Sequence, residues 1–250
     1  MLIPKFEGRP TVFKALVGSH NYNLNDEQSD KDYKYFVMPT FDDMYAGKMF
    51  STSKVGQVED YDVHDIRKCI HLWWQANINF IEVLYTSELH LFDDIPGGDI
   101  LQDIFGMRAR IVTMNLPYLY NACVGMYCQK MAHLVKGTEG TRHLVEKFGY
   151  DTKQALHAYR CLDFLRRFKE YNWDFRRAMH YEDTGIRERD YLLSIKRGEW
   201  EFDDCREMIS SMNDVVAGYA KAYKEIPPNE ATKNKLDGLV KDLVRKNIVG

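Results

Sequence analysis

The strongest constraint on the fold is a polar interruption between two strand-like segments near the start of the chain. An apolar run of strand length, residues 11–17, ends at Gly18 and Ser19. Ten residues rich in asparagine follow, a composition typical of loops. The next strand-like segment begins with Asp30 and Asp32. This order predicts two strands joined by a polar loop, with Gly-Ser at one end of the loop and Asp-x-Asp at the other.

The two aspartates indicate either half of a metal site or a hairpin whose acidic face lies in solvent. Because side chains alternate along a strand, Asp30 and Asp32 are expected to share one face while Lys31 points away. Carboxylates this close repel each other unless a cation lies between them or a pKa is raised. Mg²⁺ is the expected cation, because it binds carboxylate and phosphate oxygens together. Gly18 would let backbone N–H groups approach a phosphate, and Ser19 would add a hydroxyl.

A second pair of carboxylates occurs on a later predicted strand. Asp60 and Asp62 are two residues apart and are therefore expected to share a face. Nucleotidyl transfer by two metals needs carboxylate ligands for ions ~3.5–4 Å apart, and three carboxylates brought together on adjacent strands would satisfy that need. Asp60 is the preferred third carboxylate because of its distance from the following helix, and Asp62 is the alternative.

A helix predicted over residues 151–171 carries basic side chains at helical spacing. Asp151 is a suitable N-cap, and Lys153, His157 and Arg160 follow one another along one face. Such a stripe suits a triphosphate, and the alternative is an exposed basic face of a structural helix.

Two other basic groups occur in the second half of the chain. Lys130 and His133, on a preceding predicted helix, would extend the stripe. A further cluster comprises Arg166, Arg167, Arg176, Arg177, His180 and Arg187. Solvated helix faces explain this cluster best, but it is also the sequence feature that could contact an RNA backbone.

The pattern of elements predicts an α+β fold with two domains. Pro96, Gly97 and Gly98 interrupt the chain, and strand patterns fade beyond them. We therefore expect a mixed β-sheet with flanking helices in residues 1–98 and a helical bundle in residues 99–250.

Composition narrows the class of protein. The net charge of −3 gives no general basic excess for nucleic acid, and no apolar stretch approaches the ~20 residues that span a bilayer. The five cysteines form no Cys-x-x-Cys pair, so reduced thiols are expected and structural zinc is not. We expect a cytoplasmic protein with no membrane partner.

Taken in order, the motifs resemble the nucleotidyltransferase superfamily typified by DNA polymerase β, and more specifically its stand-alone bacterial and phage "predicted nucleotidyltransferase" branch. The matching residues are Gly18-Ser19-His20 with Tyr22, Ser29 to Asp32, Asp60 ahead of Lys68, Asn77 with Glu82 and Leu84, and Gly149-Tyr150-Asp151 with Lys153, Ala155, His157 and Arg160. Two positions depart from the pattern. Lys31 replaces a usually apolar residue and requires solvent or a salt-bridge partner, and Ile78 replaces a frequent proline.

The resemblance implies a nucleotidyltransferase core in residues 1–98 and a helical domain that contributes to the nucleotide or acceptor site. It assigns phosphate contacts to Gly18 and Ser19. The implied metal ligands and catalytic residues are Asp30, Asp32 and Asp60, and the further nucleotide-binding residues are Lys153, His157 and Arg160. Glu82 either orients the active-site side of its helix or is a buried carboxylate paired with a base.

The implied activity is transfer of an NMP from an NTP, with ATP expected, to a hydroxyl-bearing acceptor, using Mg²⁺ or Mn²⁺ and releasing pyrophosphate. A small molecule, a protein side chain and an RNA 3′ end are all open as acceptors. One alternative is a non-catalytic nucleotide-binding module, either a sensor or a toxin–antitoxin component. The other is a structural α+β protein with acidic strand faces in solvent.

Overall fold

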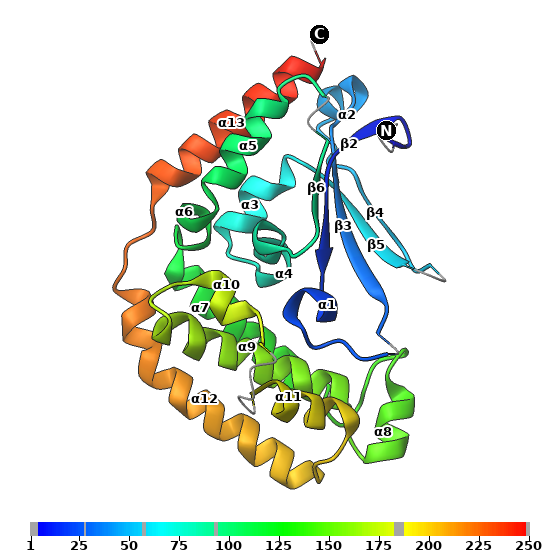
Figure 1. Ribbon diagram of the computed structural model, residues 1–250, viewed down its shortest axis with the longest axis vertical. Coiled ribbons are helices and arrows are strands. Elements are labelled where there is room, and N and C mark those ends of the chain that lie inside the picture. Colours follow the sequence, from blue (N-terminus) through cyan, green and yellow to red (C-terminus); the bar gives the residue numbers. More distant parts are fainter. Residues whose placement is uncertain (1–4, 28, 57–58, 93–94, 183–187, 249–250) are drawn as a thin grey trace. The chain divides into compact units, whose positions relative to one another are not determined.

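The computed structural model describes residues 5–27, 29–56, 59–92, 95–182 and 188–248, and the chain divides into two compact units (Figure 1). Unit 1 comprises Met1–Asn115 and Pro228–Gly250, and unit 2 comprises Leu116–Pro227. Unit 1 combines a mixed β-sheet with helices, whereas the described residues of unit 2 form helices without strands. The α+β class predicted from the sequence is confirmed.

The sheet of unit 1 pairs the two strands that flank the polar loop. The strands are β1 (Lys5–Phe6), β2 (Arg9–Val17), β3 (Lys31–Val37), β4 (Ser51–Lys54), β5 (Glu59–Asp65) and β6 (Leu89–Leu91). Their order is β1-β2-β3-β5-β4, and β6 also pairs with β2. The pair β3–β5 is parallel and the other pairs are antiparallel. The end of β2 therefore lies beside the start of β3, which in turn lies beside the start of β5.

Side-chain alternation gives this sheet two different faces. One face is an apolar cluster formed by Leu16, Tyr33, Tyr35, Val37 and Val63. On the opposite face, Phe13 stacks on Phe36 with ring centroids 4.4 Å apart. The same face becomes polar towards the starts of β3 and β5, where Asp32 and Asp60 occupy paired positions. This polar end of the sheet carries the candidate site.

Helices complete unit 1. They are α1 (Ser19–Tyr22), α2 (Phe41–Tyr45), α3 (Lys68–Trp74), α4 (Ile78–Ile81), the 3₁₀ helix η1 (Glu82–Tyr85), α5 (Gly98–Gly106), α6 (Arg108–Val112) and α13 (Glu230–Ile248). The last helix, α13, packs on α3, α5 and α6. The division of the chain thus differs from the expected boundary after residue 98, because α5, α6 and α13 share contacts with the first half of the chain.

Unit 2 is organised around one helix. Its helices are α7 (Leu116–Ala132), α8 (Arg142–Phe148), α9 (Thr152–Glu170), α10 (Phe175–Met179), α11 (Glu188–Arg197) and α12 (Phe202–Lys224). All the others pack on α9, which corresponds to the helix predicted over 151–171. Among the described residues of both units, no helix has the length and apolar character needed to cross a membrane.

The start of α9 depends on Asp151, as predicted. Asp151 is buried, and its Oδ1 accepts a hydrogen bond from the backbone N–H of Gln154 at 3.0 Å. The Thr141 hydroxyl donates to the same carboxylate. We expect Asp151→Ala to lower the free energy of unfolding by about 1–2 kcal/mol, because it removes the cap from the central helix. Urea unfolding followed by circular dichroism measures this, with Asp151→Asn as the control that keeps a capping oxygen. An alanine variant as stable as the wild type would contradict the prediction.

Candidate functional site

The turn after β2 is shaped by direct contact between Gly18 and Asp32. Gly18 has φ 72° and ψ −149°, a conformation that disfavours any residue with a side chain. A Cβ on Gly18 would lie 2.6 Å from Asp32 Oδ2. Gly18 is therefore required both for the backbone conformation and for the space that the carboxylate occupies.

Glu82 anchors the same turn from η1. Its buried carboxylate accepts a hydrogen bond from the Gly18 N–H at 3.1 Å and one from Asn21 Nδ2 at 3.4 Å. Asn21 Oδ1 in turn accepts from the Ser87 N–H at 2.9 Å. Glu82 is therefore a buried carboxylate that holds the turn through the Gly18 N–H and the Asn21 amide. The Gly18 N–H is bonded to Glu82, and the contact of the other backbone N–H groups of this turn with a phosphate stays a prediction.

The polar loop is closed on itself by His20. His20 Nε2 donates to the Ser29 carbonyl at 2.9 Å, which joins the two ends of the loop. Ser29 Oγ also bonds Asp26, accepting from its N–H at 2.9 Å and donating to its Oδ1 at 2.8 Å. The Ser19 hydroxyl has no hydrogen-bond partner among the described residues. Ser19 thus keeps the donor that the sequence assigned to a phosphate.

The candidate carboxylates differ in their position: Asp32 and Asp60 lie in neighbouring strands, whereas Asp30 lies in a loop. Asp32 lies in β3, is partly buried and is paired in register with Asp60 of the parallel strand β5. Asp60 Oδ1 accepts from the Gly56 N–H at 2.9 Å. Asp30 precedes β3, which begins at Lys31, and is exposed. The shared strand face expected for Asp30 and Asp32 is therefore corrected, because Asp30 is a loop residue.

Asp62 is engaged elsewhere. It lies on the same face as Asp60 but is 2.9 Å from Lys34 Nζ and accepts from Ser53 Oγ at 2.6 Å. Burial acts to raise the pKa of Asp62, but the hydrogen bonds from Ser53 and Lys34 outweigh it and the pKa lies below its usual value. Asp60 is therefore the carboxylate beside Asp32 in the sheet, whereas Asp62 is bonded to Lys34 and Ser53.

Two further observations concern the metal and the departure at Lys31. Within the described ranges, no group of three or more His, Cys, Asp or Glu side chains is arranged to hold a metal ion. Lys31 is exposed, and its Nζ lies 3.5 Å from Glu88. Lys31 therefore has both the solvent access and the acidic partner that its position was expected to need.

In unit 2, the basic stripe of α9 changes from exposed to buried along its length. Lys153 is exposed, His157 is partly buried, and Arg160 retains only 5% exposure. The pKa of His157 is lowered to about 3 by burial and then by the charges of Arg160, Lys130, Lys153 and Lys196. A cationic group drawn from α7, α9 and α11 thus surrounds a neutral histidine. Arg160 is buried, so the stripe is not an exposed basic face along its whole length, and its contact with a nucleotide stays a prediction.

The depressed pKa of His157 predicts acid sensitivity. An ordinary histidine has a pKa near 6.5, whereas His157 stays neutral in the folded protein down to about pH 3. The unfolded chain therefore binds the extra proton, and the stability present above pH 6.5 is expected to fall by about 1.4 kcal/mol per pH unit between these values.

Urea unfolding of wild type and His157→Gln across this window measures that contribution as the difference between the two slopes. His143→Gln, an exposed position on α8, is the matched control and should keep the wild-type slope. Equal slopes for wild type and His157→Gln would contradict the prediction.

Sequence reasoning missed the structural roles of Asn21 and His20, since an asparagine or histidine in a polar loop has no pattern that identifies its partner. Glu82 did carry a signal, because it is a lone charge in an apolar segment. In comparison with known proteins, no family model matches this chain and no curated protein matches it. The resemblance to nucleotidyltransferases therefore depends on the ordered motifs alone.

Proposed function

We propose that this protein is a metal-dependent nucleotidyltransferase that transfers an NMP from an NTP to a hydroxyl-bearing acceptor. One observation carries the proposal: Asp32 lies against Gly18 and is paired in register with Asp60 at the starts of two parallel strands. Carboxylates on neighbouring strands beside a glycine turn can hold the metal ions that assist nucleotidyl transfer, and this is the arrangement that the resemblance to nucleotidyltransferases implies. ATP is the expected donor.

The cation proposed for this end of the sheet is Mg²⁺ or Mn²⁺. Asp30, Asp32 and Asp60 would hold the metal, and all three offer the carboxylate oxygens that these hard cations prefer. The Gly56 N–H donates a hydrogen bond to Asp60 Oδ1, so Oδ2 is the oxygen that would bind a metal ion. A bound metal would neutralise charge on the triphosphate and favour ionisation of the acceptor hydroxyl.

The chain's own groups then have defined roles in the transfer. Asp60 accepts the proton of the acceptor hydroxyl, whose oxygen forms a bond to the α-phosphorus. The bond from that phosphorus to the β-phosphate oxygen breaks, and pyrophosphate leaves. Ser19 donates its free hydroxyl to a phosphate oxygen. Gly18 is a positioning residue, since its missing side chain makes room for Asp32.

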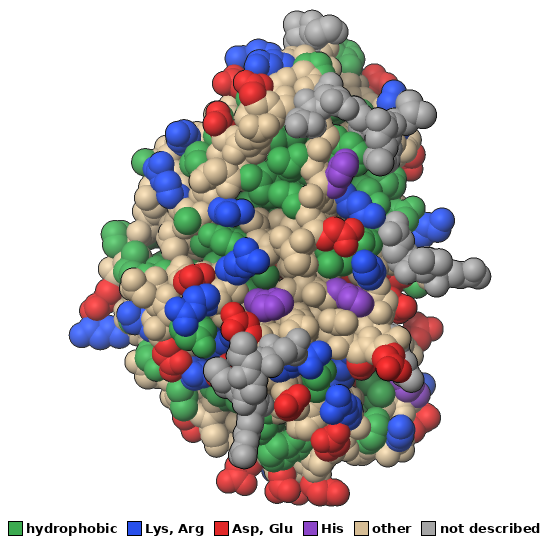
Figure 2. All heavy atoms as spheres, in the orientation of Figure 1, with side chains coloured by type: hydrophobic (Ala, Val, Ile, Leu, Met, Phe, Trp, Pro, Cys, Tyr) green, Lys and Arg blue, Asp and Glu red, His purple; other side chains and the backbone are tan. Residues whose placement is uncertain are grey.

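The charge of the protein surface indicates which class of acceptor it could bind. On the face drawn in Figure 2, acidic and basic side chains are interspersed over the described residues, in agreement with the net charge of −3. A long nucleic-acid footprint requires a larger basic surface. The net charge therefore favours a small molecule, a protein side chain or a short RNA 3′ end as the acceptor.

The experiment that tests the proposal identifies donor and acceptor together. The protein is incubated with each α-labelled NTP, with Mg²⁺ or Mn²⁺ and total cell extract, and label is followed into small-molecule, protein and RNA fractions. We expect metal-dependent labelling of one fraction with equimolar release of pyrophosphate. Nucleotide binding without pyrophosphate release across all fractions would instead support the non-catalytic binding module. Failure to bind magnesium–NTP at millimolar concentration would refute both.

A further inference from the structure

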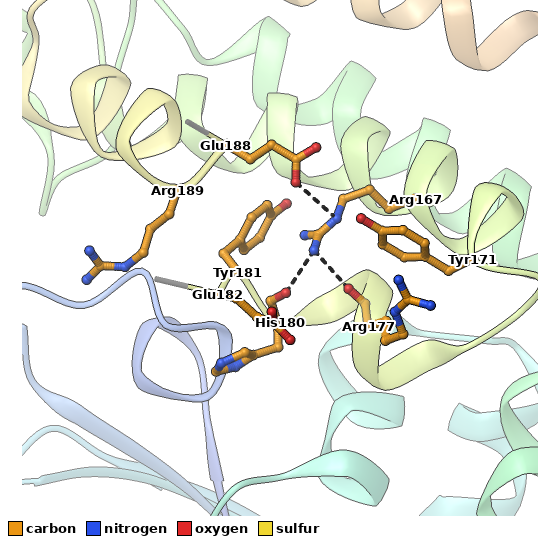
Figure 3. A pocket seen from close by; sticks show the side chains of 8 residues that line it. All are labelled: Arg167, Tyr171, Arg177, His180, Tyr181, Glu182, Glu188 and Arg189. Carbon is orange, nitrogen blue, oxygen red and sulfur yellow. Dashed lines mark hydrogen bonds and ion pairs between the residues drawn. The ribbon is translucent and has the colours of Figure 1, made fainter. Parts of the chain in front are cut away.

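Several residues of the basic cluster described in the sequence analysis line a cavity within unit 2. It has a volume of about 110 Å³ and is lined by residues of α9, α10, α11 and the segment after α10 (Figure 3). One water molecule needs only about 10–15 Å³ of such volume, so the cavity has room for a larger polar group. Arg167, Arg177 and Arg189 all contribute to its lining. Arg187, also part of the cluster, lies outside the described residues.

Arg167 is fixed in place but incompletely bonded. Its side chain is 5% exposed, and Nη2 donates to the carbonyls of Arg177 and His180, both at 2.8 Å. The guanidinium carbon lies 4.2 Å from the centre of the Tyr181 ring. Nε and Nη1 are buried and make no hydrogen bond within the described residues. Buried donors normally have partners, so these two N–H groups, of which Nε also lies 3.7 Å from Glu188, suit an acceptor bound in the cavity.

The charges around the cavity favour an anionic acceptor. Glu188 lies 3.7 Å from Arg167 Nε, but its other oxygen is 3.0 Å from Arg166, so its charge is shared between two arginines. Arg177 is exposed, and its guanidinium stacks 4.4 Å from the centre of the Tyr171 ring. Figure 3 shows Arg167 at the centre of the group, with Tyr171 and Arg177 beside it. The described lining holds two acidic residues, Glu182 and Glu188, against three arginines.

We propose that this cavity binds a phosphate group, held by the unused N–H groups of Arg167 and by the charge of Arg177. The planar guanidinium fork matches phosphate oxygens, and a stacked guanidinium keeps its N–H edges available. Its lining residues all belong to unit 2, whereas the carboxylates belong to unit 1, and the proposal does not depend on nucleotidyl transfer. The bound phosphate group belongs either to a free phosphate compound or to the end of an RNA strand.

The test titrates the full-length protein with inorganic phosphate and follows the Arg167 Nε–H resonance by NMR, assigned with Arg167→Lys. We expect a saturable shift with phosphate and none with chloride at equal ionic strength. Arg177→Gln should raise the Kd for phosphate about tenfold, the loss expected for one charged partner. Arg176→Gln is the matched control: Arg176 is exposed on the same helix but does not line the cavity, so its Kd should change by less than about twofold.

Competition distinguishes the two sources. A short oligoribonucleotide with a 5′-phosphate that displaces inorganic phosphate, while its unphosphorylated counterpart does not, supports a strand terminus; failure of both to compete supports a small phosphate compound. The proposal is overturned if the Arg167 resonance shows no saturable response to phosphate, or if Arg177→Gln and Arg176→Gln bind phosphate equally well. Because Arg177 is exposed, its variant remains informative even where a change at Arg167 unfolds unit 2.

Discussion

Asp32→Asn is expected to slow NMP transfer by about a hundredfold or more while the protein remains folded. The change keeps the shape of the side chain against Gly18 and removes the charge that would hold a metal. Loss of several kcal/mol of transition-state stabilisation corresponds to a rate loss of at least this size. The measurement is the initial rate of pyrophosphate release with saturating NTP and the acceptor found by labelling.

Three further variants make that result specific. Asp60→Asn is expected to cause a comparable loss, whereas Asp62→Asn should retain transfer, since Asp62 is bonded to Lys34 and Ser53. Asp42→Asn, at an exposed position in α2, is the control for a simple change of net charge. Transfer at the wild-type rate by Asp32→Asn would refute the mechanism, and a larger loss at Asp62 than at Asp60 would reassign the third carboxylate.

Gly18→Ala is expected to destabilise unit 1 and to displace the Asp32 carboxylate. The new Cβ would lie 2.6 Å from Asp32 Oδ2, and alanine would be forced to adopt φ 72°. Backbone strain of this kind costs about 1–3 kcal/mol, and the steric clash adds to it. Both the free energy of unfolding and the rate of transfer should therefore fall.

A double-mutant cycle separates the clash from the strain. In an Asp32→Ala background the Oδ2 atom is absent, so the cost of Gly18→Ala should be smaller there. Gly8→Ala is a matched control, because Gly8 has φ +82° but a Cβ there would meet nothing within 4 Å. Fully additive costs at positions 18 and 32 would show that the carboxylate does not occupy the space beside Gly18.

The sequence predicted local geometry well and long-range partners poorly. Strand alternation correctly placed Asp60 and Asp62 on one face, and the N-cap at Asp151 followed from residue type and position. The partner of the Gly18 N–H could not be predicted, because Glu82 is 64 residues away and no local pattern joins them. The metal and nucleotide roles of these residues remain predictions.

Burial was the other property that the sequence could not supply. Helical spacing puts Lys153 and Arg160 on one side of α9, but it does not say which part of that side other helices cover. In the structure Lys153 is exposed and Arg160 is buried. The sequence also did not show where β3 begins. Alternation of side chains applies only inside a strand, and β3 starts one residue after Asp30, so the spacing of Asp30 and Asp32 did not place them on one face.

The return of the chain to unit 1 through α13 has a consequence for folding during synthesis. Unit 2 is an insertion, and the backbone leaves and re-enters unit 1 at neighbouring points, where the Asn229 N–H donates to the Met114 carbonyl at 2.7 Å. The surfaces of α3, α5 and α6 that α13 covers stay open until α13 has left the ribosome. Unit 2 is thus able to complete its fold first, and the carboxylate-bearing sheet belongs to the unit that is finished last.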